Sequence, residues 1–143
     1  MDIRAYQASD EGAVVSLWEE CGLTRPWNDP RKDIARKLTI QPDLFLVGTV
    51  EDHLIATVMA GYEGHRGWVN YLAVAPKARG QGFGRALMES VERLLLNLGC
   101  PKLNIQVRSS NADVLAFYRA IGYAPEEMVS LGKRLIHDNS TAA

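Results

Sequence analysis

The stretch of the sequence with the clearest potential for chemistry runs from Val74 to Leu87 and reads VAPKARGQGFGRAL. Gly80, Gly82 and Gly84 alternate within it, and basic residues flank them. Glycine adopts positive φ angles and lets a ligand approach the backbone closely. The free N–H groups and the dipole at the start of a following helix favour an anion. The stretch therefore predicts a site for a phosphate or pyrophosphate group.

Two common nucleotide-binding loops do not fit this spacing. A P-loop requires GxxxxGK followed by Ser or Thr, and the sequence contains no such string. A Rossmann loop requires GxGxxG and an acidic residue about 20 positions later. Its third glycine would fall on Arg85 or Leu87, and the region that should supply the acid has none. What remains is the pattern R-x-x-G-x-G, which begins at Arg79.

The elements that must position this loop follow from hydrophobic periodicity and from turn signals. Strands are predicted over Asp2 to Gln7, Leu44 to Val50, Leu54 to Tyr62, Trp68 to Val74, Leu103 to Val107 and Met128 to Ile136. Helices are predicted from Ser9 or Asp10 to Cys21, from Asp29 and Pro30 to Leu38, from Phe83 to Leu98 and from Asn111 to Ile121.

The predicted order is therefore β-α-α-β-β-β-α-β-α-β, which indicates an α/β protein with a mixed sheet and helices on its faces. The three consecutive strands with short turns should be antiparallel, and the unit from Trp68 to Val107 should be a right-handed parallel crossover. Trp68 to Val74 is apolar on both faces, so we expect this strand inside the sheet. The loop between Val74 and Phe83 then joins a buried strand to a strongly amphipathic helix.

Composition limits the classes of function. The 143 residues are 47% hydrophobic and 23% charged, which fits one domain over residues 1–137 with a polar tail over residues 138–143. The formal net charge of −1 argues against nucleic acid as a partner. No apolar run approaches the roughly 20 residues of a membrane span, and the first residues do not resemble a signal peptide. We therefore expect a cytoplasmic protein.

The histidines and the two cysteines, Cys21 and Cys100, show no ligand spacing, so neither a metal site nor a disulfide framework is expected. Cys21 and Cys100 are read as packing residues at helix ends. No Asp or Glu occurs between Gly64 and Met88, whereas four basic residues do, and this local positive charge also suits an anionic ligand.

At this point the loop resembles a known motif. Val74-x-Pro76-x-x-Arg79-Gly80-x-Gly82-x-Gly84-x-x-Leu87 is similar to the acetyl-CoA-binding motif of the GNAT N-acetyltransferase superfamily. A second segment, Asn111 followed by Phe117-Tyr118 and Gly122-Tyr123, resembles the later motif of that family, and the order of elements follows the family along the chain. The strings LTRPWNDP, HRG and SLGKRLI resemble a small bacterial branch, the YpeA-like proteins.

The resemblance implies an N-acetyltransferase that uses acetyl-CoA as co-substrate and no metal. The residues implied in cofactor binding are Leu72, Ala73, Val74, Arg79, Gly80, Gln81, Gly82, Phe83, Gly84, Asn111 and Phe117. In this reading the loop holds the pyrophosphate, and the strand before it pairs with the pantetheine amides. The N–H of Val74 would polarise the thioester carbonyl. Tyr118 is the implied general acid, because tyrosine is protonated at neutral pH.

The base and the acceptor are less closely defined by the sequence. Glu63 is the predicted general base, with His65, Asn70 and ordered water as alternatives. The acceptor is expected against the first two helices and their connection, at Arg25, Trp27, Asn28 and Asp29. An Asp and an Asn can recognise an amine and Arg25 a carboxylate, a combination that points to an amino acid or a peptide N-terminus. Each of these residues also has a purely structural reading.

The predicted activity is transfer of an acetyl group from acetyl-CoA to a primary amine. The alternative is a non-catalytic acyl-CoA-binding or interaction module on the same scaffold. Tyr118 and the complete RGQGFG loop favour the enzyme, because a degenerate copy tends to lose one of them. Neither nucleic acid nor a membrane is expected as a partner, and both a monomer and a homodimer are compatible with the sequence.

Overall fold

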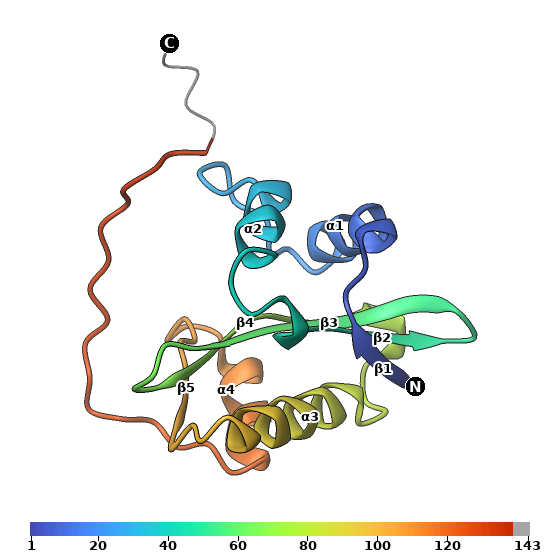
Figure 1. Ribbon diagram of the computed structural model, residues 1–143. Coiled ribbons are helices and arrows are strands. Elements are labelled where there is room, and N and C mark those ends of the chain that lie inside the picture. Colours follow the sequence, from blue (N-terminus) through green and yellow to red (C-terminus); the bar gives the residue numbers. More distant parts are fainter. Residues whose placement is uncertain (139–143) are drawn as a thin grey trace.

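The computed structural model describes residues 1–138 as a mixed sheet with helices on both faces (Figure 1). Five strands lie in the spatial order β1-β2-β3-β4-β5, and their bounds are Asp2–Ala5, Phe45–Val50, His53–Tyr62, Gly67–Val74 and Leu103–Ile105. The helices α1 and α2 cover one face and α3 and α4 cover the other (Figure 1); they span Glu11–Glu20, Pro30–Lys37, Phe83–Asn97 and Ala112–Ala120.

The predicted α/β class and mixed sheet are confirmed. Strands β1 to β4 pair antiparallel in sequence order, and β5 joins β4 in parallel. The parallel pair is short, because only Gly67–Val69 lie opposite Leu103–Ile105. β4 and β5 therefore share no ladder beyond Val69 and Ile105, which leaves the second half of β4 without a strand partner on that side.

Two apolar cores lie on the two faces of the sheet. On one face, α1 and α2 bury Val14, Trp18 and Ile34 against β2 and β3. On the other, α3 buries its apolar stripe, including Leu87, Val91 and Leu95. This stripe is the one predicted from helical periodicity. β2 is buried along nearly its whole length, as expected for a strand covered on both faces.

Two of the helix caps follow the sequence signals, whereas Asp10, at the start of α1, makes no side-chain cap hydrogen bond. The side chain of Asp29 caps α2 by accepting the N–H of Arg31 at 2.9 Å, and the side chain of Asn111 caps α4 by accepting the N–H of Val114 at 3.3 Å. α3 begins after Gly82, which has a φ of 82° and no side chain to offer. Its first N–H groups therefore lack a side-chain acceptor from the cap residue.

The structure corrects the predicted last strand. Residues Met128 to Ile136 are not in a strand, and no ladder among residues 1–138 includes them. They run in an extended path from the α4 side of the sheet to the α2 side (Figure 1). Five apolar side chains on this path are largely exposed: Met128, Val129, Leu131, Leu135 and Ile136. A strand needs a backbone partner, and this segment finds none within the described part of the chain.

The structure also differs from the expected tail at Asp138, which is buried. Its carboxylate accepts the backbone N–H of Asp29 at 2.8 Å and a hydrogen bond from Arg36 Nη2 at 2.6 Å. Lys32 Nζ donates to its carbonyl at 3.0 Å. Asp138 is therefore an anchor for the C-terminal segment on α2. The remaining residues of the predicted tail, 139–143, lie outside the described residues.

Among residues 1–138, no helix is both long and apolar enough to cross a membrane. Within the same range, no group of three or more His, Cys, Asp or Glu side chains is arranged to hold a metal ion.

Candidate active site

A large open cavity of about 810 Å³ lies where β4 and β5 separate. Most of its wall comes from four places in the fold: the α1–α2 connection, α2, the middle of β4, and the segment from β5 to α4; Met59 of β3 and Ile40 also line it. Among the residues predicted for the site, the cavity is lined by Arg25, Trp27, Asn28, Leu72, Asn111 and Tyr118. The structure thus gathers most of the predicted acceptor residues and the predicted acid around one space.

The glycine loop follows β4 and contributes no residue to the lining of this cavity, and its backbone leaves room for a ligand. Gly80 and Gly82 have φ angles of 80° and 82°, and a Cβ atom built on either would meet nothing within 4 Å. Arg79 is tied back to the end of β4, because its Nε donates to the carbonyl of Val74 at 3.1 Å. The open backbone and the uncapped start of α3 fit a pyrophosphate, which accepts hydrogen bonds from such N–H groups.

Gly84 has a different role, because it lets the two sequence motifs touch. A Cβ atom at Gly84 would lie 3.2 Å from Cζ of Phe117 and 3.7 Å from Cγ2 of Val74. The ring of Phe117 therefore packs directly on the start of α3. Gly84 and Phe117 are 33 positions apart in the sequence. Through their contact, the loop motif and the later Phe117-Tyr118 motif form one wall in space.

β4 carries an irregularity at the centre of the site. Thr57 pairs with Ala73 and Met59 with Asn70, so β4 has one residue more than β3 between these pairs. Within this bulge Tyr71 adopts a φ of 53°, an unfavourable region for a residue with a Cβ atom. The bulge turns the backbone of β4 just before Leu72, Ala73 and Val74, the strand residues predicted to bind the cofactor arm.

Buried neighbours hold the bulge in place. Thr57, which is 0% exposed, donates from Oγ1 to the carbonyl of Tyr71 at 2.9 Å and accepts Nε1 of Trp18 at 2.9 Å. The indole of Trp18 stacks on the ring of Tyr71 with centroids 3.8 Å apart. The phenol of Tyr71 donates to Oδ2 of Asp33 at 2.7 Å. Burial raises the pKa of Tyr71 to about 12, with a further contribution from Asp33, so the phenol stays protonated.

Tyr118 faces the same cavity from α4. Its side chain is 8% exposed, and burial alone raises the pKa of Tyr118 to about 12. Its ring packs edge-on against Phe117 and Tyr123, with centroids 5.0 and 5.7 Å away. No hydrogen bond from its hydroxyl is found among the described residues. A protonated phenol in the cavity wall has the proton that a general acid needs.

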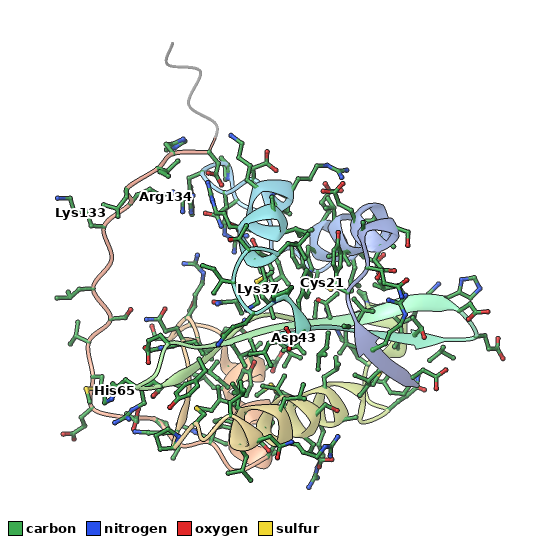
Figure 2. All side chains as sticks on the ribbon, in the orientation of Figure 1. Cys21, Lys37, Asp43, His65, Lys133 and Arg134 are labelled. Carbon is green, nitrogen blue, oxygen red and sulfur yellow. The ribbon has the colours of Figure 1, made fainter. Side chains whose placement is uncertain are left out.

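Glu63 lies elsewhere and does not line the cavity. Its carboxylate accepts the backbone N–H groups of His65 and Arg66 and the indole N–H of Trp68, all within the turn between β3 and β4 and at the start of β4. These hydrogen bonds lower the pKa of Glu63, and the bond from the N–H of Arg66 has the largest effect. His65 is exposed and lies at the outer end of the same turn (Figure 2). Asn70, the third predicted alternative, does line the cavity.

One of the four residues predicted for the acceptor does not line the cavity. Asp29 does not line the cavity, because it caps α2 and contacts Asp138 through its backbone. Three charged residues of α2 line the cavity, and sequence reasoning did not select them: Asp33, Arg36 and Lys37. Figure 2 shows Lys37 on the α1–α2 side of the sheet, near Cys21. Their spacing places them on one face of the helix, but nothing in the sequence says which face meets the cavity.

The fold and this site define a class of protein, and the comparisons agree. Residues 13–123 match the acetyltransferase (GNAT) family, so the chain belongs to the GNAT acetyltransferases. It is 50% identical over 138 residues to an acetyltransferase of Yersinia enterocolitica, a match that covers 96% of this chain and 98% of the relative. An uncharacterized N-acetyltransferase of Yersinia pestis is 49% identical over the same length, and together these findings make the chain an N-acetyltransferase.

Solved structures share the fold at low sequence identity. Ard1 from Thermoplasma volcanium superposes with a TM-score of 0.78 at 22% identity, over 86% of this chain and 82% of that one. The ribosomal-protein-S18-alanine N-acetyltransferase from Escherichia coli has a TM-score of 0.69 at 24% identity, over 85% and 76%. AAC(6')-Iy in complex with a CoA-containing bisubstrate analogue has a TM-score of 0.77 at 18% identity, over 93% and 97%.

Proposed function

We propose that this protein transfers the acetyl group of acetyl-CoA directly to a primary amine, carried by a small molecule, an amino acid or a peptide N-terminus. The observation that carries the proposal is the shared wall described above. An uncapped helix start with a glycine loop adjoins a protonated, buried Tyr118, and Phe117 packed on Gly84 joins the two. A loop for an anionic cofactor and a proton donor are what this transfer needs in one place.

In the proposed complex, the backbone from Arg79 to Gly84 binds the pyrophosphate, and Leu72, Ala73 and Val74 bind the pantetheine arm along the free edge of β4. Asn111 contacts the same arm from the start of α4. When bound, acetyl-CoA supplies an activated thioester carbonyl. The N–H of Val74 is the proposed donor to that carbonyl oxygen, where negative charge develops.

The reaction needs one group that gives a proton to the leaving thiolate and one that takes a proton from the attacking amine. The N–C bond forms as the C–S bond breaks, and the phenol of Tyr118 gives its proton to the departing thiolate. The attacking nitrogen loses a proton in the same reaction. Glu63 remains the predicted base for that proton, and because its side chain does not line the cavity, water has to carry the proton to it. Unchanged turnover in Glu63→Gln would exclude Glu63 and leave the alternatives, His65, Asn70 and water, for this role.

The experiment that tests the proposal has two stages. Calorimetric titration with acetyl-CoA should show binding at one site per chain, and the absence of binding contradicts both the enzyme and the alternative acyl-CoA-binding module. Release of free thiol from acetyl-CoA on addition of a primary amine then separates the two. The enzyme releases thiol in proportion to acetylated amine, whereas the module binds acetyl-CoA and releases none.

Partners and location follow from the same proposal. The amine acceptor is the proposed partner, with neither nucleic acid nor a membrane required, and the cytoplasm, where acetyl-CoA is made, is the proposed location. Of the two oligomeric states compatible with the sequence, the homodimer is favoured. β5 is an edge strand, and the neighbouring segment from Met128 to Ile136 exposes apolar side chains without a backbone partner. Light scattering distinguishes a mass of 15.8 kDa from twice that value.

A further inference from the structure

The acceptor side of the cavity carries an excess of positive charge. Within residues 1–138, the charged side chains that line the cavity are one carboxylate, Asp33, and four cations: Arg25, Arg36, Lys37 and Arg108. Arg36 is neutralised by Asp138 at 2.6 Å and by Asp33 at 3.2 Å. None of the other three cations has a carboxylate within salt-bridge distance in the described part of the chain.

Arg25 and Lys37 belong to the α1–α2 side, opposite the glycine loop and α3. Within residues 1–138, the guanidinium of Arg25 donates only to backbone carbonyls, those of Gly22 at 2.8 Å and Thr24 at 2.9 Å. These bonds fix its position without neutralising its charge. A guanidinium so placed keeps N–H donors for a carboxylate or a phosphate.

Lys37 is held near β3, where its ammonium is half-buried. Its Nζ lies 3.6 Å from the position of a Cβ atom built on Gly61. The connection after α2 is pinned there, because the side-chain amide of Gln41 accepts the N–H of Tyr62 at 2.8 Å and donates to its carbonyl at 2.9 Å. Burial lowers the pKa of Lys37, and the charge of Asp43 only partly offsets this effect, so the ammonium is incompletely compensated in the free protein. An anion in the cavity supplies that compensation.

The amine end of an acceptor has its own partners in the same wall. Oδ1 of Asn28 is buried and has no hydrogen-bond partner among residues 1–138. The Nδ2 of the same side chain donates to Asp33 at 2.7 Å, which fixes the amide. An unpaired buried carbonyl oxygen beside a carboxylate accepts N–H groups of an amine.

From this arrangement we propose that the acceptor is an amine that also carries an anionic group, a carboxylate or a phosphate. Arg25 and Lys37 bind the anionic group, while Asn28 and Asp33 receive the amine. Polycationic acceptors, such as polyamines and aminoglycosides, are disfavoured by the same charges. The inference rests on the proposed acetyl transfer and adds the chemical class of the acceptor to it.

Matched acceptors test the proposal through thiol release from acetyl-CoA. L-amino acids are compared with their amides, phosphoethanolamine with ethanolamine, and spermidine represents the polycations. We expect kcat/KM for the acid-bearing member of a pair to exceed that of its neutral partner by roughly 10- to 100-fold. The two pairs separate a carboxylate from a phosphate as the group that is bound.

Variants assign the preference to its residues. In Lys37→Met and Arg25→Met the ratio of acid to neutral acceptor should fall about tenfold or more, whereas Lys133→Met, which removes an exposed charge outside the cavity, should leave it unchanged. Comparing this ratio between the wild type and each variant cancels the difference in basicity between the two amines of a pair. A ratio near one in the wild type, spermidine as the best acceptor, or a ratio unaffected by both substitutions overturns the inference. If none of the amines leads to thiol release from acetyl-CoA, the proposed acetyl transfer itself is contradicted.

Discussion

Thr57 offers the sharpest test of how the active-site strand is held. Its hydroxyl is completely buried and makes two hydrogen bonds of 2.9 Å, one from the indole of Trp18 and one to the carbonyl of Tyr71. Thr57→Val keeps the shape of the side chain and removes both. The indole N–H is then left in an apolar surrounding without an acceptor, and the carbonyl of the bulge loses its donor.

The magnitude follows from these two groups. An unsatisfied buried polar group costs about 1–3 kcal/mol, and a carbonyl tends towards the lower end. We therefore expect Thr57→Val to lower the free energy of unfolding by about 2–4 kcal/mol. Thr57→Ser is the matched control, because it keeps the hydroxyl and loses one methyl group, worth about 1 kcal/mol. The valine variant should be the less stable of the two by about 1–3 kcal/mol.

Urea denaturation followed by tryptophan fluorescence measures both values. A second measurement addresses function, because the hydroxyl supports a residue with a φ of 53° just before the proposed cofactor strand. Acetyl-CoA affinity, determined by calorimetry on folded protein, should fall in Thr57→Val and be retained in Thr57→Ser. If the two variants differ by less than about 0.5 kcal/mol and bind acetyl-CoA equally, the hydroxyl does not support the bulge.

Three further outcomes are expected. Tyr118→Phe should reduce turnover with little change in acetyl-CoA affinity, measured by thiol release and calorimetry; unchanged turnover excludes the phenol as the acid. Gly84→Ala should weaken acetyl-CoA binding in a titration, because its Cβ would meet the ring of Phe117 at 3.2 Å. Hydrogen bonds lower the pKa of Asp138 from its usual 3.8 to about 2, and the bond from Arg36 has the largest effect. Its stabilising contribution is then complete above about pH 4 and is lost as the pH falls to about 2, so the melting-temperature gap between wild type and Asp138→Asn should close over that interval.

Much of the fold was predictable because the responsible signals are local. Helical periodicity placed α3 on the correct residues, and Asp29 and Asn111 marked two helix starts that the structure confirms. The strand prediction at Met128 to Ile136 was wrong because β-propensity is conditional on a partner. Those residues favour extended backbone, and they are extended, but no ladder in residues 1–138 includes them.

The site was predictable only where a motif marks it. Nothing in the string NYLAV indicates a bulge, and its apolar character predicts a regular strand. The positive φ of Tyr71 depends on Thr57 and Trp18, which are 14 and 53 positions away in the sequence. The sequence does not mark Asp33 or Lys37 as residues of the site either, since a charged residue on a short helix is usually solvated. Their place in the cavity is set by the packing of α2 over β3 and β4.

The two halves of the site are joined through Tyr71. Its backbone lies in the bulge that orients Leu72 to Val74 towards the proposed cofactor arm, and its phenol donates to Asp33 on the proposed acceptor side. Asp33 is in turn bonded to Asn28 and to Arg36. A change of the acceptor wall at Asp33 removes the partner of a phenol whose backbone is strained, so it acts on both substrates. Asp33→Ala, which leaves the phenol of Tyr71 without its acceptor, should therefore weaken acetyl-CoA binding as well as raise KM for the amine. Lys37→Met, which has no bond to Tyr71, should change only KM for the amine. Equal acetyl-CoA affinity in the wild type and in Asp33→Ala would mean that the two halves are independent.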